Sequence, residues 1–251
     1  MTSFIIFTTQ RSGSTVLTRT LDQHPEVLCA GELFHEINRI YHPEWHFPFL
    51  GITAKNKLLR NIGKILNYPN VRFRAISHIK KFYQADSKNE NARGFKLMYS
   101  QIKLMPHLWN YLKDNNIKVI VLIRKNIFKT GLSRLRMKIT HLSHSEQKSQ
   151  AIGNKQFYIN PVKLLKHMQY IEKINRELIA KTDEMDRIIV YYEDFEQWKD
   201  LMEKICRFLK VERLSLQPAL NKISGKDWKN EVSNHEEIEK FLKEKNYSQY
   251  L

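Results

Sequence analysis

The sequence predicts an α/β fold of three layers with a central parallel sheet. Short apolar runs rich in strand-forming residues alternate with segments of helical spacing, an order typical of such sheets. The run Lys118–Ile123 is almost continuously apolar, as expected of a strand buried on both faces. A Gly, Ser and Thr cluster follows the first apolar run, Phe4–Phe7, which predicts a phosphate-loop-like strand, loop and helix.

The elements expected in the N-terminal half follow from these patterns. Val16–Leu21 has helical spacing, and Val27–Ala30 follows a turn-prone His-Pro pair. The complete order is strand Phe4–Phe7, helix Val16–Leu21, strand Val27–Ala30, helices Lys55–Leu66 and Arg72–Gln84, a charged link Asp86–Arg93, and strand Phe95–Tyr99.

The C-terminal half is expected to continue the alternation. Pro161 stands at a favourable first position for a long helix. The complete order is strand Lys118–Ile123, helix Ile127–Ile139, a polar loop Ser143–Gln156, helix Pro161–Lys181, strand Arg187–Tyr191 and helix Trp198–Leu209. Ligands of parallel α/β domains bind beyond the carboxyl ends of the strands, so the loops after Phe7 and Ile123 are candidate sites.

Size and composition limit the class of protein. The 251 residues, 42% of them hydrophobic, can bury one sizeable core, and we expect a single domain over residues 1–251. The formal charge of +16 predicts a surface that attracts phosphate, sulfate, nucleic acid or acidic glycans. Cys29 and Cys206 lack metal-ligand or redox spacing, which favours a reducing compartment. No run approaches the ~20 apolar residues of a membrane span, and no signal peptide is evident, so we expect a cytoplasmic protein.

The loop Gln10–Thr15 is the first candidate site. A loop of small polar residues before a helix exposes backbone N–H groups, and the helix N-terminus favours an anion. The loop lacks the Gly-Lys-Ser/Thr ending of nucleoside-triphosphatases, while Arg11 supplies a planar fork suited to phosphate or sulfate oxygens. Taken alone, the string also fits an ordinary strand-to-helix turn. The expected ligand-binding residues are Arg11, Ser12, Gly13, Ser14 and Thr15.

Several segments together resemble one enzyme family. Thr9-Gln-Arg-Ser-Gly-Ser-Thr-Val-Leu resembles the 5′-phosphosulfate loop of sulfotransferases that use 3′-phosphoadenosine-5′-phosphosulfate (PAPS). The stretch 21–34 is similar to the segment after that loop in bacterial carbohydrate and nodulation-factor sulfotransferases, and more loosely in tyrosylprotein sulfotransferases. In those families its glutamate is the catalytic base, which implies Glu32, with Glu26 and Glu36 as rivals. Gly94-Phe-Lys-Leu-Met-Tyr-Ser-Gln resembles the strand with a catalytic lysine, which implies Lys96.

Three further segments resemble the part of the family that binds the nucleotide. The segment 121–133 is similar to the 3′-phosphate motif and implies Ser133 with either Arg124 or Lys125 as ligands. Tyr192-Glu-Asp-Phe resembles the segment with an adenine-contacting tyrosine. The stretch 222–230 looks like the loop that closes over the 3′-phosphate, in which Trp228 either stacks on adenine or packs the loop. From this loop the resemblance implies Lys226, Trp228 and Lys229.

The resemblance implies in-line transfer of a sulfuryl group from PAPS to an acceptor hydroxyl of a saccharide or small natural product. Glu32 would take the hydroxyl proton, while Arg11 and Lys96 would stabilise the departing 3′,5′-adenosine bisphosphate. No metal is expected: His42 and His46 come nearest to zinc-ligand spacing, and Pro43 between them argues against a helical site. Two alternatives are a nucleotide kinase-like transferase and a basic nucleic-acid-binding module. The nucleic-acid-binding module would leave Glu32 unexplained. We expect no nucleic-acid partner, and a homo-oligomer is compatible with the sequence.

Overall fold

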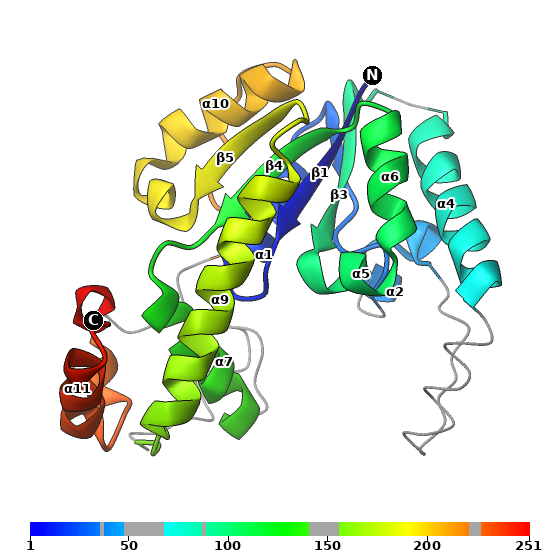
Figure 1. Cartoon of the computed structure of the whole chain (residues 1–251). Coiled ribbons are helices and arrows are strands. Elements are labelled where there is room, and N and C mark those ends of the chain that lie inside the picture. The colour runs from blue at the N-terminus through cyan, green and yellow to red at the C-terminus, as the bar shows by residue number, and fades with distance from the viewer. Residues whose placement is uncertain (36–37, 48–67, 87–88, 141–155, 221–226) are drawn as a thin grey trace.

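Five parallel strands form one sheet within the described part of the chain. The computed structural model describes residues 1–35, 38–47, 68–86, 89–140, 156–220 and 227–251 (Figure 1). The strands are β1 (Thr2–Thr8), β2 (Val27–Cys29), β3 (Ala92–Met98), β4 (Lys118–Ile123) and β5 (Arg187–Tyr191). They pair in parallel in the order β2-β3-β1-β4-β5, which confirms the predicted parallel sheet.

The strand register brings the carboxyl ends together at one edge of the sheet. Thr8 at the end of β1 pairs with Met98 of β3 and Leu122 of β4. Ile123 at the end of β4 pairs with Tyr191 at the end of β5. The loops that follow β1, β4 and β5 therefore start next to one another, where α/β domains bind their ligands.

Helices connect the strands, and most of them pack on the sheet (Figure 1). The helices are α1 (Ser14–Leu21), α2 (Asn38–Tyr41), α4 (Tyr68–Gln84), α5 (Tyr99–Leu104), α6 (Pro106–Asp114), α7 (Ile127–Thr140), α9 (Pro161–Lys181), α10 (Trp198–Leu209) and α11 (His235–Glu244). Short 3-10 turns are η1 (Pro43–Trp45), η3 (Tyr192–Gln197), η4 (Trp228–Asn230) and η5 (Ser248–Tyr250). Among the helices within the described ranges, none combines the length and apolarity that a membrane crossing requires.

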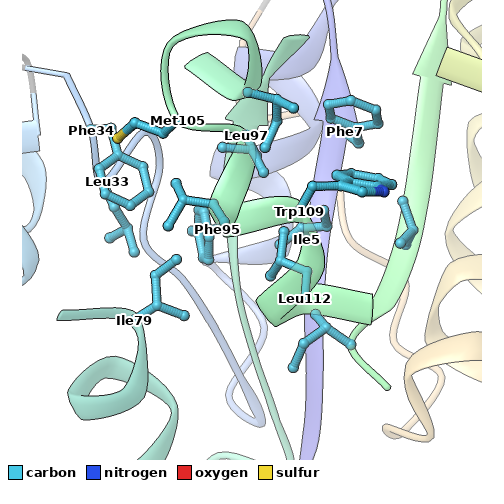
Figure 2. Packing of buried hydrophobic residues seen from close by; sticks show 14 of the residues in the cluster. Ile5, Phe7, Leu33, Phe34, Ile79, Phe95, Leu97, Met105, Trp109 and Leu112 are labelled. Atoms are coloured by element: carbon cyan, nitrogen blue, oxygen red, sulfur yellow. The ribbon is translucent and has the colours of Figure 1, made fainter. Parts of the chain in front are cut away.

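The first face of the sheet packs against α4, α5, α6 and α9. Alternate residues of a strand point to opposite faces, and Ile5 and Phe7 of β1 lie in this layer. Figure 2 shows them beside Trp109 of α6, whose ring centroid lies 4.8 Å from that of Phe7. Ile79 of α4 and Leu178 of α9 complete the same buried cluster.

The opposite face packs against α1 and α10. Phe4 and Ile6 of β1 meet Leu17 of α1 and Ile205 of α10 in a second buried cluster. The two clusters on either side of the sheet confirm the predicted three-layer arrangement. A third cluster joins α7, α9 and α11, and Phe128 of α7 is fully buried within it.

The structure corrects two boundaries around β3. Ala92 and Arg93 belong to the strand, although the sequence predicts a charged link over Asp86–Arg93. Arg93 can enter the core because its guanidinium donates to the carbonyls of Phe82 and Ala85 at the end of α4, at 2.9 and 2.8 Å. At the other end, Tyr99 begins α5 and does not extend the strand.

Other predicted elements agree closely, and some lie outside the described residues. The strand Arg187–Tyr191 and the helices Pro161–Lys181 and Trp198–Leu209 have the predicted bounds. The helix predicted at Val16 begins earlier, at Ser14, so the last two residues of the candidate loop form its first turn. The predicted helix Lys55–Leu66 and nearly all of the loop Ser143–Gln156 fall outside the described ranges.

Candidate active site

The loop between β1 and α1 is held at the carboxyl edge of the sheet by buried hydroxyl groups. Thr8 Oγ1 donates to the carbonyl of Leu122 in β4 at 2.7 Å and lies 2.6 Å from Ser12 Oγ. The hydroxyl of Ser12 also donates to the Thr9 carbonyl at 2.9 Å. Ser12 is therefore a buried support of the loop, and its side chain is fully enclosed.

The loop turns into α1 through two left-handed residues, Arg11 and Gly13, with φ of 68° and 86°. Gly13 is the N-cap, and a Cβ there would lie 2.5 Å from the Tyr192 ring, so this position needs glycine for space as well as for its backbone. Among the described residues no side chain caps the N-terminus of α1. The first-turn N–H groups, which include those of Ser14 and Thr15, can therefore bind an anion.

Glu32 and Lys96 form an ion pair beside the start of α1. Glu32 follows β2 and the left-handed Gly31, and its Oε1 lies 3.0 Å from Lys96 Nζ of β3. Lys96 Nζ also donates to Thr15 Oγ1 at 3.5 Å. The Glu32 side chain keeps 16% of its surface exposed and that of Lys96 keeps 9%. A carboxylate and an ammonium group thus meet next to the candidate anion site.

The two rival glutamates do not share this position. Glu26 precedes β2, at the opposite end of the sheet, and its Oε2 accepts the backbone N–H of Glu212 at 2.6 Å. Its carboxylate also accepts from the Asn91 side chain, just before β3. Glu36 lies outside the described residues.

On the other side of the loop, Arg11 contacts α7. Arg11 Nε donates to Ser133 Oγ at 2.9 Å, which joins two residues that are 122 positions apart. Arg124, directly after β4, donates from Nη1 to the Arg11 carbonyl at 3.4 Å and lies 4.3 Å from the centroid of the Tyr192 ring. The structure thus brings together Arg11, Arg124, Ser133 and Tyr192 from four separate segments.

Arg124 and Lys125 point in different directions. The Arg124 guanidinium is largely buried, and no acceptor within the described ranges reaches its Nε. Lys125 is exposed, and its ammonium group lies 3.9 Å from the centroid of the Tyr191 ring. The Glu193 carboxylate accepts the backbone N–H of Lys125 at 3.1 Å and so fixes the backbone just after Arg124.

Arg136 is a third guanidinium in this region, which sequence reasoning missed. Burial lowers the pKa of Arg11, and the charges of Arg136 and Arg124 lower it further. Arg136 pairs with Glu231 through Nη1 and Oε2 at 2.6 Å. Arg136 lies three residues after Ser133, so both lie on one side of α7. This spacing is the feature of the sequence that could have identified Arg136 as a residue of the site. The positive charges of Arg11 and Arg124 favour an anion here, whereas Glu231 balances the charge of Arg136.

The remaining residues predicted from the C-terminal segment pack elsewhere. The Trp228 ring centroid lies 4.8 Å from that of Phe128, within the cluster of α7, α9 and α11. Lys229 Nζ pairs with Glu239 Oε1 of α11 at 2.5 Å. Lys226 lies outside the described residues. No three His, Cys, Asp or Glu side chains of the described ranges gather in a way that could hold a metal ion.

The fold and site define a class: a parallel α/β protein with a candidate anion-binding loop beside a glutamate–lysine pair. A family model described as "Sulfotransferase family" matches residues 3–215, and the chain therefore belongs to the sulfotransferase family, as its motifs predict. The match includes Arg11, Glu32, Lys96 and Arg124 but ends before Trp228.

Two solved structures are similar to this chain, and the first of them supports the fold. A sulfotransferase from Alicyclobacillus acidocaldarius superposes with a TM-score of 0.50 at 15% identity, over 88% of this chain and 86% of that chain. A sulfotransferase named STF9 from Mycobacterium avium gives a TM-score of 0.41 at 13% identity, over 97% of this chain and 75% of that chain. No curated protein matches the sequence.

Proposed function

We propose that the protein transfers the sulfuryl group of PAPS to a hydroxyl group of a saccharide or small natural product. Membership of the sulfotransferase family supports the reaction class. The observation that carries the proposal is the ion pair between Glu32 and Lys96, 3.0 Å apart and next to Thr15 at the N-terminus of α1. It supplies a base and a cation where the anion loop would hold the donor.

The side chains fit a ligand with several anionic groups. Two observations on the described part of the chain support this fit: the buried Arg124 Nε has no acceptor there, and no side chain there caps the first turn of α1. In the proposal Arg11, Ser12, Gly13, Ser14 and Thr15 hold the 5′-phosphosulfate. Arg124 and Ser133 hold the 3′-phosphate, and Tyr192 contacts adenine. The 4.3 Å stacking of Arg124 on Tyr192 favours Arg124 over the exposed Lys125.

PAPS, when bound, supplies an activated sulfuryl group and a bisphosphate leaving group. Glu32 accepts the proton of the acceptor hydroxyl, because its carboxylate is partly exposed and lies beside the donor site. Lys96 and Arg11 provide fixed positive charges for the oxygen atoms that become more negative during transfer. Alignment and electrostatics are sufficient for such a reaction, as in phosphoryl transfer.

Three further features of the molecule belong to the same proposal. The chain functions as one domain over residues 1–251, in the cytoplasm; Cys29 and Cys206 are buried free thiols, which suits a reducing compartment. The segment with Lys226, Trp228 and Lys229 closes over the bound nucleotide. The packing of Trp228 on Phe128 favours a structural role for this side chain.

Thermal shift measurements test the nucleotide preference. We expect 3′,5′-adenosine bisphosphate to raise Tm, whereas ATP and a single-stranded oligonucleotide at equal concentration leave it nearly unchanged. A ligand at 100 times its Kd stabilises the native state by about 2.7 kcal/mol, which a melting curve detects readily. Stabilisation by ATP alone would favour a nucleotide kinase, and stabilisation by the oligonucleotide alone a nucleic-acid-binding module.

A further inference from the structure

Gln101 connects the junction of β3 and α5 to the candidate base. Its side chain is buried, and its Oε1 accepts the backbone N–H of Met98 at 2.9 Å, which caps the start of α5. The amide Nε2 then faces away from Met98 and donates to Glu32 Oε2 and to the Phe34 carbonyl, both at 3.4 Å. Because an amide has one acceptor end and one donor end, the Met98 bond fixes which end meets Glu32.

The two oxygens of Glu32 have different partners. Oε1 lies 3.0 Å from the Lys96 ammonium, and Oε2 receives the hydrogen bond from Gln101. Lys96 also donates to Thr15 at the anion loop, so a bound anion would compete with Glu32 for its charge. A bound anion would not draw Gln101 away from Glu32 in this way, since the Gln101 amide is hydrogen-bonded to the backbone of Met98 and Phe34.

We propose that Gln101 is a positioning residue that holds Glu32 in line with the acceptor hydroxyl, a role that rests on the proposed function. The amide holds Oε2 and leaves Oε1 to face the acceptor once Lys96 turns to the donor. A neutral donor orients the carboxylate without a second full positive charge, which would weaken Glu32 as a base.

The substitution Gln101→Glu separates this role from helix capping. The new carboxylate is nearly isosteric and still accepts the Met98 N–H, but in its ionised form it cannot donate to Glu32 and places a like charge beside it. We expect kcat to fall roughly tenfold or more, while KM for PAPS and Kd for 3′,5′-adenosine bisphosphate change less than about twofold. The acid limb of the kcat profile should move to higher pH, because two adjacent carboxylates retain a shared proton.

Turnover is measured as bisphosphate release from PAPS with water as the acceptor, so the natural acceptor need not be known. Ser100→Glu is the matched control, because it adds the same charge at the neighbouring exposed position of α5. The Glu32 carboxyl titration, followed by 13C NMR and assigned with Glu32→Gln, gives a readout that does not depend on turnover; its midpoint should rise in Gln101→Glu and stay fixed in Ser100→Glu.

A double-mutant cycle decides whether Gln101 acts through Glu32. In a Glu32→Gln background, Gln101→Glu should cause little further loss of kcat. Additive losses, or an unchanged kcat and titration midpoint in Gln101→Glu, would overturn the positioning role while bisphosphate binding stays normal. Failure of the wild-type chain to bind the bisphosphate would instead refute the proposed function itself, and the inference with it.

Discussion

Replacing Arg124 with methionine removes a guanidinium group from the proposed 3′-phosphate site and keeps a side chain of similar length. In the structure Arg124 Nε is buried without an acceptor in the described ranges, and its guanidinium stacks on Tyr192 at 4.3 Å. A charge-assisted hydrogen bond to a phosphate contributes about 1.5–3 kcal/mol. Its loss should therefore raise the Kd for 3′,5′-adenosine bisphosphate roughly 10- to 150-fold.

The assay is isothermal titration calorimetry with two nucleotides. Adenosine 5′-monophosphate lacks the 3′-phosphate, so its Kd should change much less in Arg124→Met than that of the bisphosphate. Lys125→Met is the matched control, because this neighbouring cation is exposed and lies over Tyr191; we expect a change below about threefold, as is usual for exposed charges. Equal weakening of both nucleotides, or a larger loss in Lys125→Met, would refute the assignment of Arg124.

Three other substitutions probe the loop, a titrating contact and the C-terminal segment. Gly13→Ala should lower Tm and weaken bisphosphate binding at least tenfold, because a Cβ would lie 2.5 Å from the Tyr192 ring at a φ of 86°; wild-type values for both would show that the loop adapts. The hydrogen bond to Asp22 raises the pKa of His42, so protonated His42 stabilises the fold below about pH 6.5, and this stabilisation is lost as pH rises through the folded-state pKa. His42→Gln should therefore remove the fall in Tm over this pH range that His42 causes. An identical dependence of Tm on pH in the wild type and His42→Gln would contradict this role of His42. Trp228→Ala should destabilise the fold by about 2–4 kcal/mol in denaturant titrations with little change in bisphosphate Kd, because its ring packs on Phe128; a large change in Kd at unchanged stability would favour stacking on adenine.

Local patterns were sufficient for much of the fold. Helix α9 was predictable over its full length, because Pro161 begins it, Asn160 caps it by accepting the Lys163 N–H, and its apolar residues recur at helical spacing. The strand β4 was predictable from its continuous apolar run, since a strand buried on both faces needs no polar side. Each of these two sequence patterns lies within one element, so neither depends on contacts with the rest of the chain.

Contacts between distant segments were beyond the reach of such patterns. Arg93 looks like part of a charged link in sequence, but the carbonyl groups at the end of α4 satisfy its guanidinium and allow it to be buried. The pair Arg136–Glu231 joins residues 95 positions apart, and the contact of Gln101 with Glu32 spans 69. The motif resemblance implied that Glu32 and Lys96 share one site. Their contacts with Gln101 and Thr15 could be found only from the folded structure.

Transfer of radiolabelled sulfate from PAPS tests the central proposal most directly. The wild-type protein and Glu32→Gln are incubated with labelled PAPS and a panel of saccharides and small hydroxyl compounds, with Glu26→Gln as the control at the other end of the sheet. We predict labelled product with the wild type and Glu26→Gln, and a loss of about 100- to 10,000-fold in kcat with Glu32→Gln at an unchanged Kd for the bisphosphate. Equal turnover of Glu32→Gln and the wild type would contradict the role of Glu32, and failure of the wild type to bind the bisphosphate or to release it from PAPS would contradict the sulfuryl transfer itself.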